Sequence, residues 1–126
     1  MQVTVSKEKI RGKAQRFEDA AKRRVAEKIE DAIEYLSYAV PVDTGAYANS
    51  MHLNPRGDSS GHGETSHRKP RGVAANPVLN EMESRMRASL ESIDVLDGAT
   101  IVNNSPHARF VETYYGIFDE LRSALR

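Results

Sequence analysis

SKEKIRGKAQRFEDAAKRRVAEKIEDAIEYLSYAV, residues 6–40, has the longest regular pattern of apolar residues in the chain. Its apolar side chains recur at gaps of three or four residues, as on one stripe of an amphipathic α-helix: Ile10, Ala14, Phe17, Ala21, Val25, Ile29, Ala32, Leu36 and Ala39. Ser6 can cap the start, and Pro41 disfavours helical geometry at Val40. The pattern therefore predicts a helix over residues 6–40.

The predicted helix is unusually long. At the rise of a regular α-helix it would extend for about 50 Å, whereas an average helix has only about 11–12 residues. Its apolar stripe is narrow, so it needs a surface to lie against. Since a polar loop interrupts the rest of the chain, we expect other subunits to supply part of that surface.

Length and composition restrict the class of protein. A chain of 126 residues has the length of one domain, and 39% hydrophobic and 6% aromatic residues predict a small core. The absence of cysteine excludes disulfides, thiolate zinc sites and cysteine nucleophiles. The N-terminus does not resemble a signal peptide, and no apolar run is long enough to cross a membrane. We expect synthesis in the cytoplasm and no membrane partner.

The net charge of zero is an average over unlike segments. Residues 7–28 carry nine Lys/Arg and four Asp/Glu, a net charge of +5, whereas residues 29–55 carry four acids and no Lys or Arg, a net charge of −4. The long helix is thus basic early and acidic late, which can steer and orient partners. The alternative is an ordinary solvated face with local pairs such as Glu18–Lys22 and Asp19–Arg23.

The residues after the helix predict a turn, a strand and a loop. Asp43 or Thr44 can bond nearby backbone amides, and Gly45 can take a positive φ angle. Residues 47–53 alternate weakly, which predicts a short strand. Residues 54–75 are rich in Pro, Gly, Ser, His and Arg, and so long a polar loop is commonly functional or ordered by a partner. We expect it to be a partner-contacting arm, disordered in the free monomer.

After the polar loop, regular structure is expected to begin again at Asn76 and Pro77. Asn76 is a candidate helix cap and Pro77 a candidate first helical residue. A second apolar stripe predicts a helix of about four turns: Leu79, Met82, Met86, Leu90 and Ile93. The Asp97-Gly98 pair between two β-prone runs predicts a hairpin of residues 93–96 and 99–103.

A last helical segment is expected from His107 to about Tyr115, with continuation through Phe118, Leu121 and Leu125 left open. The expected class is α+β: a long N-terminal helix packed on a small antiparallel sheet, with further shorter helices.

Motifs of chemistry are sparse. The four histidines, His52, His62, His67 and His107, do not have the spacing of common zinc motifs. There is no Gly-x-Ser-x-Gly elbow, phosphate-binding glycine loop or convincing acid pair, so we expect neither catalysis nor a cofactor.

Basic residues offer a second class of function. Nine of them could contact phosphates or a partner protein: Lys13, Arg16, Lys22, Arg23, Arg24, Arg56, Arg68, Lys69 and Arg71. Aromatic residues are not interleaved with them, and no helix-turn-helix is evident. A small, non-sequence-specific nucleic-acid-binding protein is therefore the second hypothesis.

Two motifs resemble a known family. PVDTGAYANS, residues 41–50, follows a long helix and resembles the P-V-D-T-G-x-L/Y-x-x-S signature of the tail-completion, or tail-component, family of tailed bacteriophages. TIVNNSPHARFVE, residues 100–112, looks like that family's second signature, in which a strand ending in Asn-Asn leads through Pro-Tyr-Ala to a helix containing a Glu. Together with the helix, the resemblance covers most of the chain. His107 stands where the family usually has Tyr, and the basic segment that often follows the next glycine is missing.

The resemblance implies one tail-completion-like domain over residues 1–126, in a structural virion protein of the phage neck that is assembled in the host cytoplasm. Such subunits form a ring, commonly six-fold, that joins the tail to the head. The implied partners are further copies of the chain, head-closure or portal-side connector proteins, and tail terminator or tail tube proteins; genomic DNA in the lumen is a further candidate.

Eight residues are expected to fix the turns of these two motifs. Pro41, Asp43, Thr44 and Gly45 would hold the turn from helix to strand. The corner from strand to helix would be held by Asn103, Asn104, Pro106 and Glu112.

Overall fold

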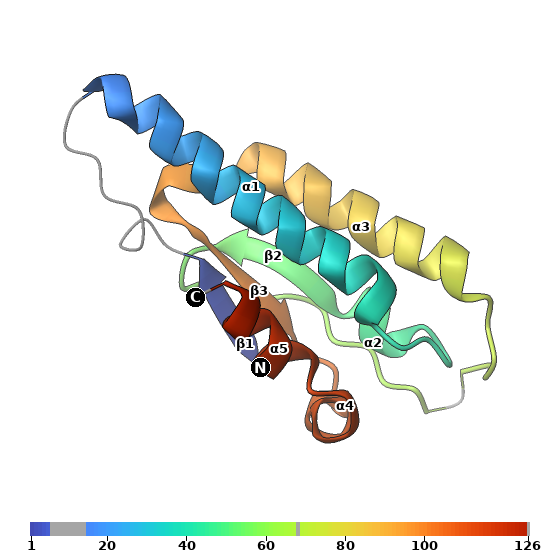
Figure 1. Ribbon diagram of the computed structural model, residues 1–126. Coiled ribbons are helices and arrows are strands. Elements are labelled where there is room, and N and C mark those ends of the chain that lie inside the picture. The colour runs from blue at the N-terminus through green and yellow to red at the C-terminus, as the bar shows by residue number, and fades with distance from the viewer. Residues whose placement is uncertain (6–14, 68, 126) are drawn as a thin grey trace.

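A computed structural model describes residues 1–5, 15–67 and 69–125 of the chain (Figure 1). The long helix α1 spans Gln15–Ala39 and ends where Pro41 predicts. The expected first turns of the helix, with the Ser6 cap, lie outside the described residues. On the described part the predicted stripe is confirmed, because Val25, Ile29 and Leu36 are fully buried.

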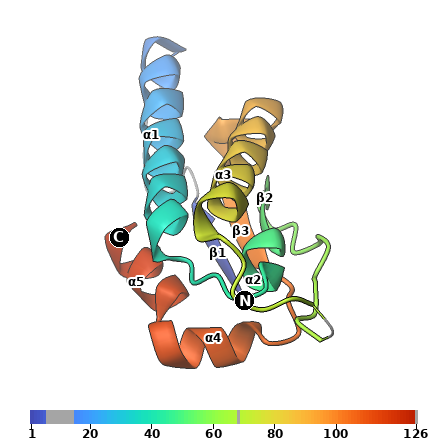
Figure 2. The same ribbon diagram turned by 90° about the vertical axis from the view of Figure 1, so that its right-hand side faces the viewer.

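The sheet in the described residues has three short strands, β1 (Gln2–Val5), β2 (Met51–Pro55) and β3 (Ala99–Asn103), in the order β1-β3-β2. β3 lies in the centre, antiparallel to both neighbours, and Ile101 is the residue opposite both Val3 and Leu53. The helices α1, α3 (Ala75–Ser92) and α5 (Ile117–Ala124) lie on one face of the sheet (Figures 1 and 2). The α+β class is therefore confirmed, whereas β1 was not predicted.

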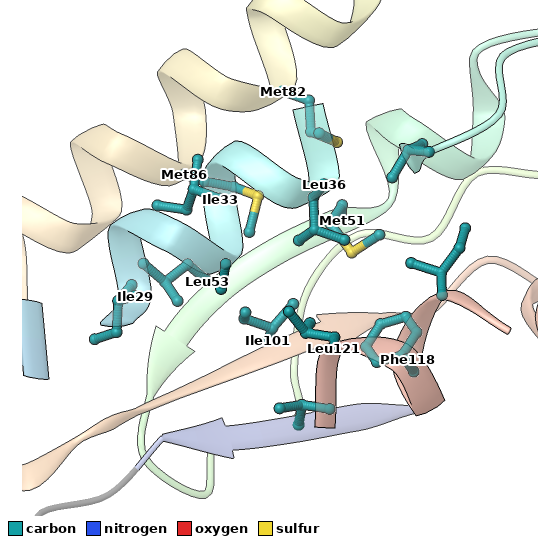
Figure 3. Packing of buried hydrophobic residues seen from close by; sticks show 14 of the residues in the cluster. Ile29, Ile33, Leu36, Met51, Leu53, Met82, Met86, Ile101, Phe118 and Leu121 are labelled. Carbon is teal, nitrogen blue, oxygen red and sulfur yellow. The ribbon is translucent and has the colours of Figure 1, made fainter. Parts of the chain in front are cut away.

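The core lies between these helices and the sheet, where ten labelled side chains converge: Ile29, Ile33, Leu36, Met51, Leu53, Met82, Met86, Ile101, Phe118 and Leu121 (Figure 3). Burying one such side chain contributes about 1.5–3 kcal/mol. α1 and α3 run side by side in opposite directions (Figure 1). The described part of α1 thus finds its packing surface within its own chain.

The predicted hairpin is wrong. Residues 95–97 form a short 3₁₀ helix, η2 (Val95–Asp97), in which the Asp94 side chain accepts a hydrogen bond from the Leu96 amide at 3.1 Å. Gly98 does need its positive φ of 95°, so the turn signal was correct. Both edges of β3 are occupied by β1 and β2, which are distant in sequence and which the local pattern could not identify.

The predicted strand over residues 47–53 is only partly correct. Residues 46–49 form a one-turn helix, α2 (Ala46–Asn49), and β2 begins at Met51. The Ser50 hydroxyl donates to the Ala46 carbonyl at 2.7 Å and helps to close this turn. The buried α2 residues therefore belong to a helix, and the alternation that predicted a strand holds from Met51 onward.

The first part of the polar loop lies against the sheet. Since Ile101 faces the helices, Thr100 faces the opposite side of the sheet, and there its hydroxyl accepts a hydrogen bond from the Gly57 amide at 2.8 Å. His52 Nε2 bonds the His62 carbonyl oxygen at 2.7 Å, and the Asn54 amide donates to the Ser60 carbonyl at 2.6 Å. Hydrogen bonds rather than apolar burial thus hold residues 56–62 against the outer side of the sheet.

The remaining helices begin and end close to the predicted residues. The cap of α3 is Ala74, so Asn76 and Pro77 are its second and third residues rather than the cap and the first residue. The predicted last helical segment and its continuation are present as α4 (Ala108–Tyr115) and α5, separated by Gly116, whose φ of 59° ends α4.

Candidate functional site

The two motifs that resemble family signatures meet through one buried amide. Asn103, at the end of β3, donates from Nδ2 to the Tyr47 carbonyl at 2.9 Å and accepts from the Ser105 amide at 3.0 Å. Asn103 is almost fully buried, so these bonds replace those that the amide would make with water. The predicted role of Asn103 at the corner from strand to helix is confirmed, and the same side chain also holds the first motif.

Within the first motif, Thr44 and Gly45 form the predicted turn. The Thr44 hydroxyl accepts from the Ala46 amide at 3.2 Å, and Gly45 has a φ of 86°. Asp43 instead reaches a distant part of the chain, because its carboxylate accepts from Arg71 Nε and from the Gly72 amide, both at 2.9 Å. The Gly72 amide, followed by Arg71, lowers the pKa of Asp43 below its ordinary value.

Within the second motif, two residues lie where the sequence predicts and one acts elsewhere. The Asn104 amide donates to the Ser59 and Gly61 carbonyls at 3.0 and 3.2 Å and so ties the loop to the corner, and Pro106 lies exposed just before α4. The expectation that Glu112 fixes the corner from strand to helix is wrong. Its two carboxylate oxygens accept from the Phe118 and Asp119 amides at 2.8 and 3.1 Å, which caps α5.

A pocket of about 440 Å³ lies between the two motifs. Apolar and aromatic side chains make up much of its lining: Pro41, Val42, Tyr47, Phe110, Val111 and Tyr115. Asp43, Arg71 and His107 add polar groups. Such a lining suits an apolar or aromatic side chain of a partner, with a few polar groups to orient it.

The outer face of α4 next to the pocket carries exposed rings. Phe110 is 64% and Tyr114 71% exposed, and their ring centroids lie 4.9 Å apart. Tyr115 is exposed as well. We call Phe110, Tyr114 and Tyr115 the aromatic end. Large exposed apolar groups that cluster in this way commonly mark a surface for protein binding.

The sequence reasoning missed Tyr47 and Ser105. Tyr47 is 4% exposed, and its hydroxyl has no hydrogen-bond partner within the described residues. Burial, and then the nearby Glu112, raise the pKa of this phenol. Ser105 is buried beside Asn103 and His107. The sequence alone does not indicate that these two side chains are buried, because their burial depends on contacts between segments that are distant in the chain.

The structure does not gather the candidate basic residues into one surface. Lys22, Arg23 and Arg24 lie on the first half of α1, whereas Arg71 lies at Asp43, just beyond the other end of that helix. Lys69 Nζ pairs with Glu64 at 3.0 Å and Arg71 with Asp43 at 2.9 Å. Arg56 follows β2, while Lys13, Arg68 and the Arg16 side chain are outside the described residues.

The described residues contain no group of three His, Asp or Glu side chains that could hold a metal ion. The helices in this part of the chain are also too short or too polar to cross a membrane. No protein-family model, curated protein or solved structure matches the chain.

Proposed function

We propose that this protein is a structural subunit of the neck of a tailed bacteriophage, one of several copies in a ring that joins the tail to the head-closure or portal complex. One observation carries the proposal. The two segments that resemble the family's signatures fold together through Asn103 and line one pocket, beside which the aromatic end lies. Residues 41–50 and 100–112 are far apart in the sequence, yet they share a surface that suits a partner protein.

The chemistry of the pocket favours binding over catalysis. Ser105 Oγ and His107 Nδ1 lie 2.9 Å apart, which resembles part of a nucleophilic dyad. However, the Ser105 hydroxyl is buried and donates its proton to the Glu64 carbonyl at 3.0 Å. It can then only accept from the imidazole, so His107 is not placed to activate it as a nucleophile.

The test is to purify the protein and mix it with the portal-side, head-closure and tail-tube proteins of the same phage, with native mass spectrometry as the readout. The wild type should form a complex with at least one of them. Phe110→Ser combined with Tyr114→Ser should weaken that complex by about 30-fold or more, since aromatic residues at the centre of an interface commonly contribute over 2 kcal/mol. Because both side chains are exposed, circular dichroism should show an unchanged fold.

Thr113→Ala is the matched control, since Thr113 is an exposed residue of the same helix whose hydroxyl bonds only its own backbone, at the Arg109 carbonyl. Equal loss of binding in this control and in the aromatic variant would contradict a specific role for the aromatic end.

Nucleic-acid binding is the competing function. Binding to duplex DNA that collapses as salt is raised, without any complex with neck or tail proteins, would contradict the connector proposal. The separated basic residues and the internal pairing of Lys69 and Arg71 support the connector.

A further inference from the structure

The solvent-exposed side of α1 carries charges of opposite sign on its two halves. Arg23 and Arg24 are exposed on the first half, and Glu30, Asp31 and Glu34 are exposed on the second. Tyr38, which is 73% exposed, lies one turn beyond Glu34 on the same side. The second half therefore combines three carboxylates with an aromatic ring, and residues 29–55 contain no Lys or Arg to neutralise them.

These charges have no ion-pair partner among the residues that the structure describes. Glu18–Lys22 and Asp19–Arg23, the local pairs considered from the sequence, are not formed, and Glu27 pairs with neither arginine. Other parts of the surface differ, because Arg71, Arg87 and Arg122 each pair with a carboxylate within their own chain. The exposed charges of α1 are thus available to another molecule.

We propose that Arg23 and Arg24 of one copy dock on Glu30, Asp31, Glu34 and Tyr38 of a second copy. The inference rests on the proposed function, in which copies of the chain must contact one another. A second copy is the occupant that the charges favour, because a single helix supplies both complementary halves. Guanidinium groups bind carboxylates in bidentate geometry and also stack on tyrosine rings, so the acidic half with Tyr38 suits arginine better than lysine.

The proposed contact is head-to-tail. The basic and acidic residues are six to eleven positions apart in the sequence, which is about 9–17 Å along the helix. In a head-to-tail contact the next copy is displaced along α1 and its own acidic half remains open for a third copy, whereas an antiparallel pair of α1 helices would use both halves at once and stop at a dimer. The head-to-tail contact between unlike faces can be repeated and can close into a ring.

Charge reversal on each side tests the contact. One variant carries Arg23→Glu and Arg24→Glu; the other carries Glu30→Lys, Asp31→Lys and Glu34→Lys. Each variant alone places like charges in every contact, so its self-association should be weakened at least 10-fold relative to the wild type. All of these side chains are exposed, and circular dichroism of each variant should match the wild type.

The decisive sample is the mixture of the two variants. Every contact between unlike variants joins opposite charges, so the mixture should recover association, and native mass spectrometry should show alternating copies in even-numbered assemblies. A matched control, Glu81→Lys with Glu91→Lys on exposed positions of α3, changes charge in the same direction and should associate like the wild type.

Three outcomes would overturn the inference: a wild type that remains monomeric at high concentration, single variants that associate normally, or a mixture that stops at a one-to-one dimer. The connector proposal is tested separately, by binding to neck and tail proteins and by assembly in their presence. A protein that binds those partners yet fails this test would keep the proposed function and lose the α1 contact.

Discussion

At the scale of single residues, we expect Asn103 to contribute more to the stability of the folded protein than Asn104, although both are asparagines in the same motif. Asn103→Ala would leave the Ser105 amide without its bond in a buried place, while the Tyr47 carbonyl would keep its bond from the Ser50 amide. Since one unsatisfied buried group costs about 1–3 kcal/mol, we expect a loss of that size in the free energy of unfolding. Urea denaturation followed by circular dichroism measures it.

Asn104→Ala is the matched control for this prediction. Asn104 is exposed, and water can replace it at the Ser59 and Gly61 carbonyls. We expect a loss within about 1 kcal/mol. Equal destabilisation by the two substitutions would mean that the amide of Asn103 does not join the two motifs as described.

Asp43 gives a prediction about pH. Its pKa in the folded protein lies below the ordinary value of 3.8, because the Gly72 amide and then Arg71 stabilise the carboxylate. The stabilisation that these bonds give the folded state is therefore fully present at pH values above the ordinary pKa. It is lost as the pH falls through the lower pKa of the folded protein. In nuclear magnetic resonance spectra the Gly72 amide should shift with a midpoint below 3.8. Asp43→Asn should abolish this titration, and a midpoint at or above the ordinary value would contradict the prediction.

The sequence could predict the structural role of a residue where that role depends only on its immediate neighbours in the chain. Gly45 and Thr44 lie in the expected turn because their φ angle and hydroxyl act within a few positions. Asp43 was expected to bond nearby amides as well, yet its partners Arg71 and Gly72 lie almost 30 residues away. A local sequence pattern does not extend over so many residues. The pairing of Asp43 with Arg71 could therefore be identified only from the structure.

At the scale of helices and strands, too, the helices that local patterns predicted are present, whereas the hairpin, which depended on long-range pairing, was wrong. α1 and α3 were predicted because an apolar stripe is a local, repeated signal. The hairpin failed because the choice of partner for β3 is not local: β1 and β2 come from opposite sides of α1 in the sequence. The alternation of Gln2-Val3-Thr4-Val5 was a signal that could have identified β1.

Glu112 permits a prediction about one element, α5. Its carboxylate accepts from the Phe118 and Asp119 amides at the start of that helix, where negative charge is also favourable to the helix dipole. Glu112→Ala should lower the free energy of unfolding by about 1–2 kcal/mol. Hydrogen exchange should show the loss of protection concentrated in α5.

The control for this prediction is Glu83→Ala on α3, which removes a surface pair with Arg87 and should change stability by about 0.5 kcal/mol or less. Uniform acceleration of exchange across the whole chain in Glu112→Ala would contradict a local capping role. A milder effect is expected for Glu112→Gln, which retains an acceptor but not the charge.

At the scale of the whole molecule, the two proposed contacts lie on different parts of the described surface. The aromatic end lies on α4, whereas Arg23 and Arg24 lie on the part of α1 farthest from it (Figures 1 and 2). The first surface is apolar, and its binding should depend weakly on salt. The second is charged, and salt screens contacts between exposed charges. The proposed connector would use both surfaces, because it would hold its own copies together and also bind a different protein.

This separation predicts that the two activities can be removed independently. Phe110→Ser with Tyr114→Ser should weaken binding to neck or tail proteins by about 30-fold or more while leaving self-association intact, because those rings do not lie on α1. Arg23→Glu with Arg24→Glu should weaken self-association at least 10-fold and leave a protein that still binds the same partner. Analytical ultracentrifugation at low and high salt, with and without that partner, distinguishes the four combinations. If either pair of substitutions removed both activities in a correctly folded protein, a single shared interface would explain the molecule better than two.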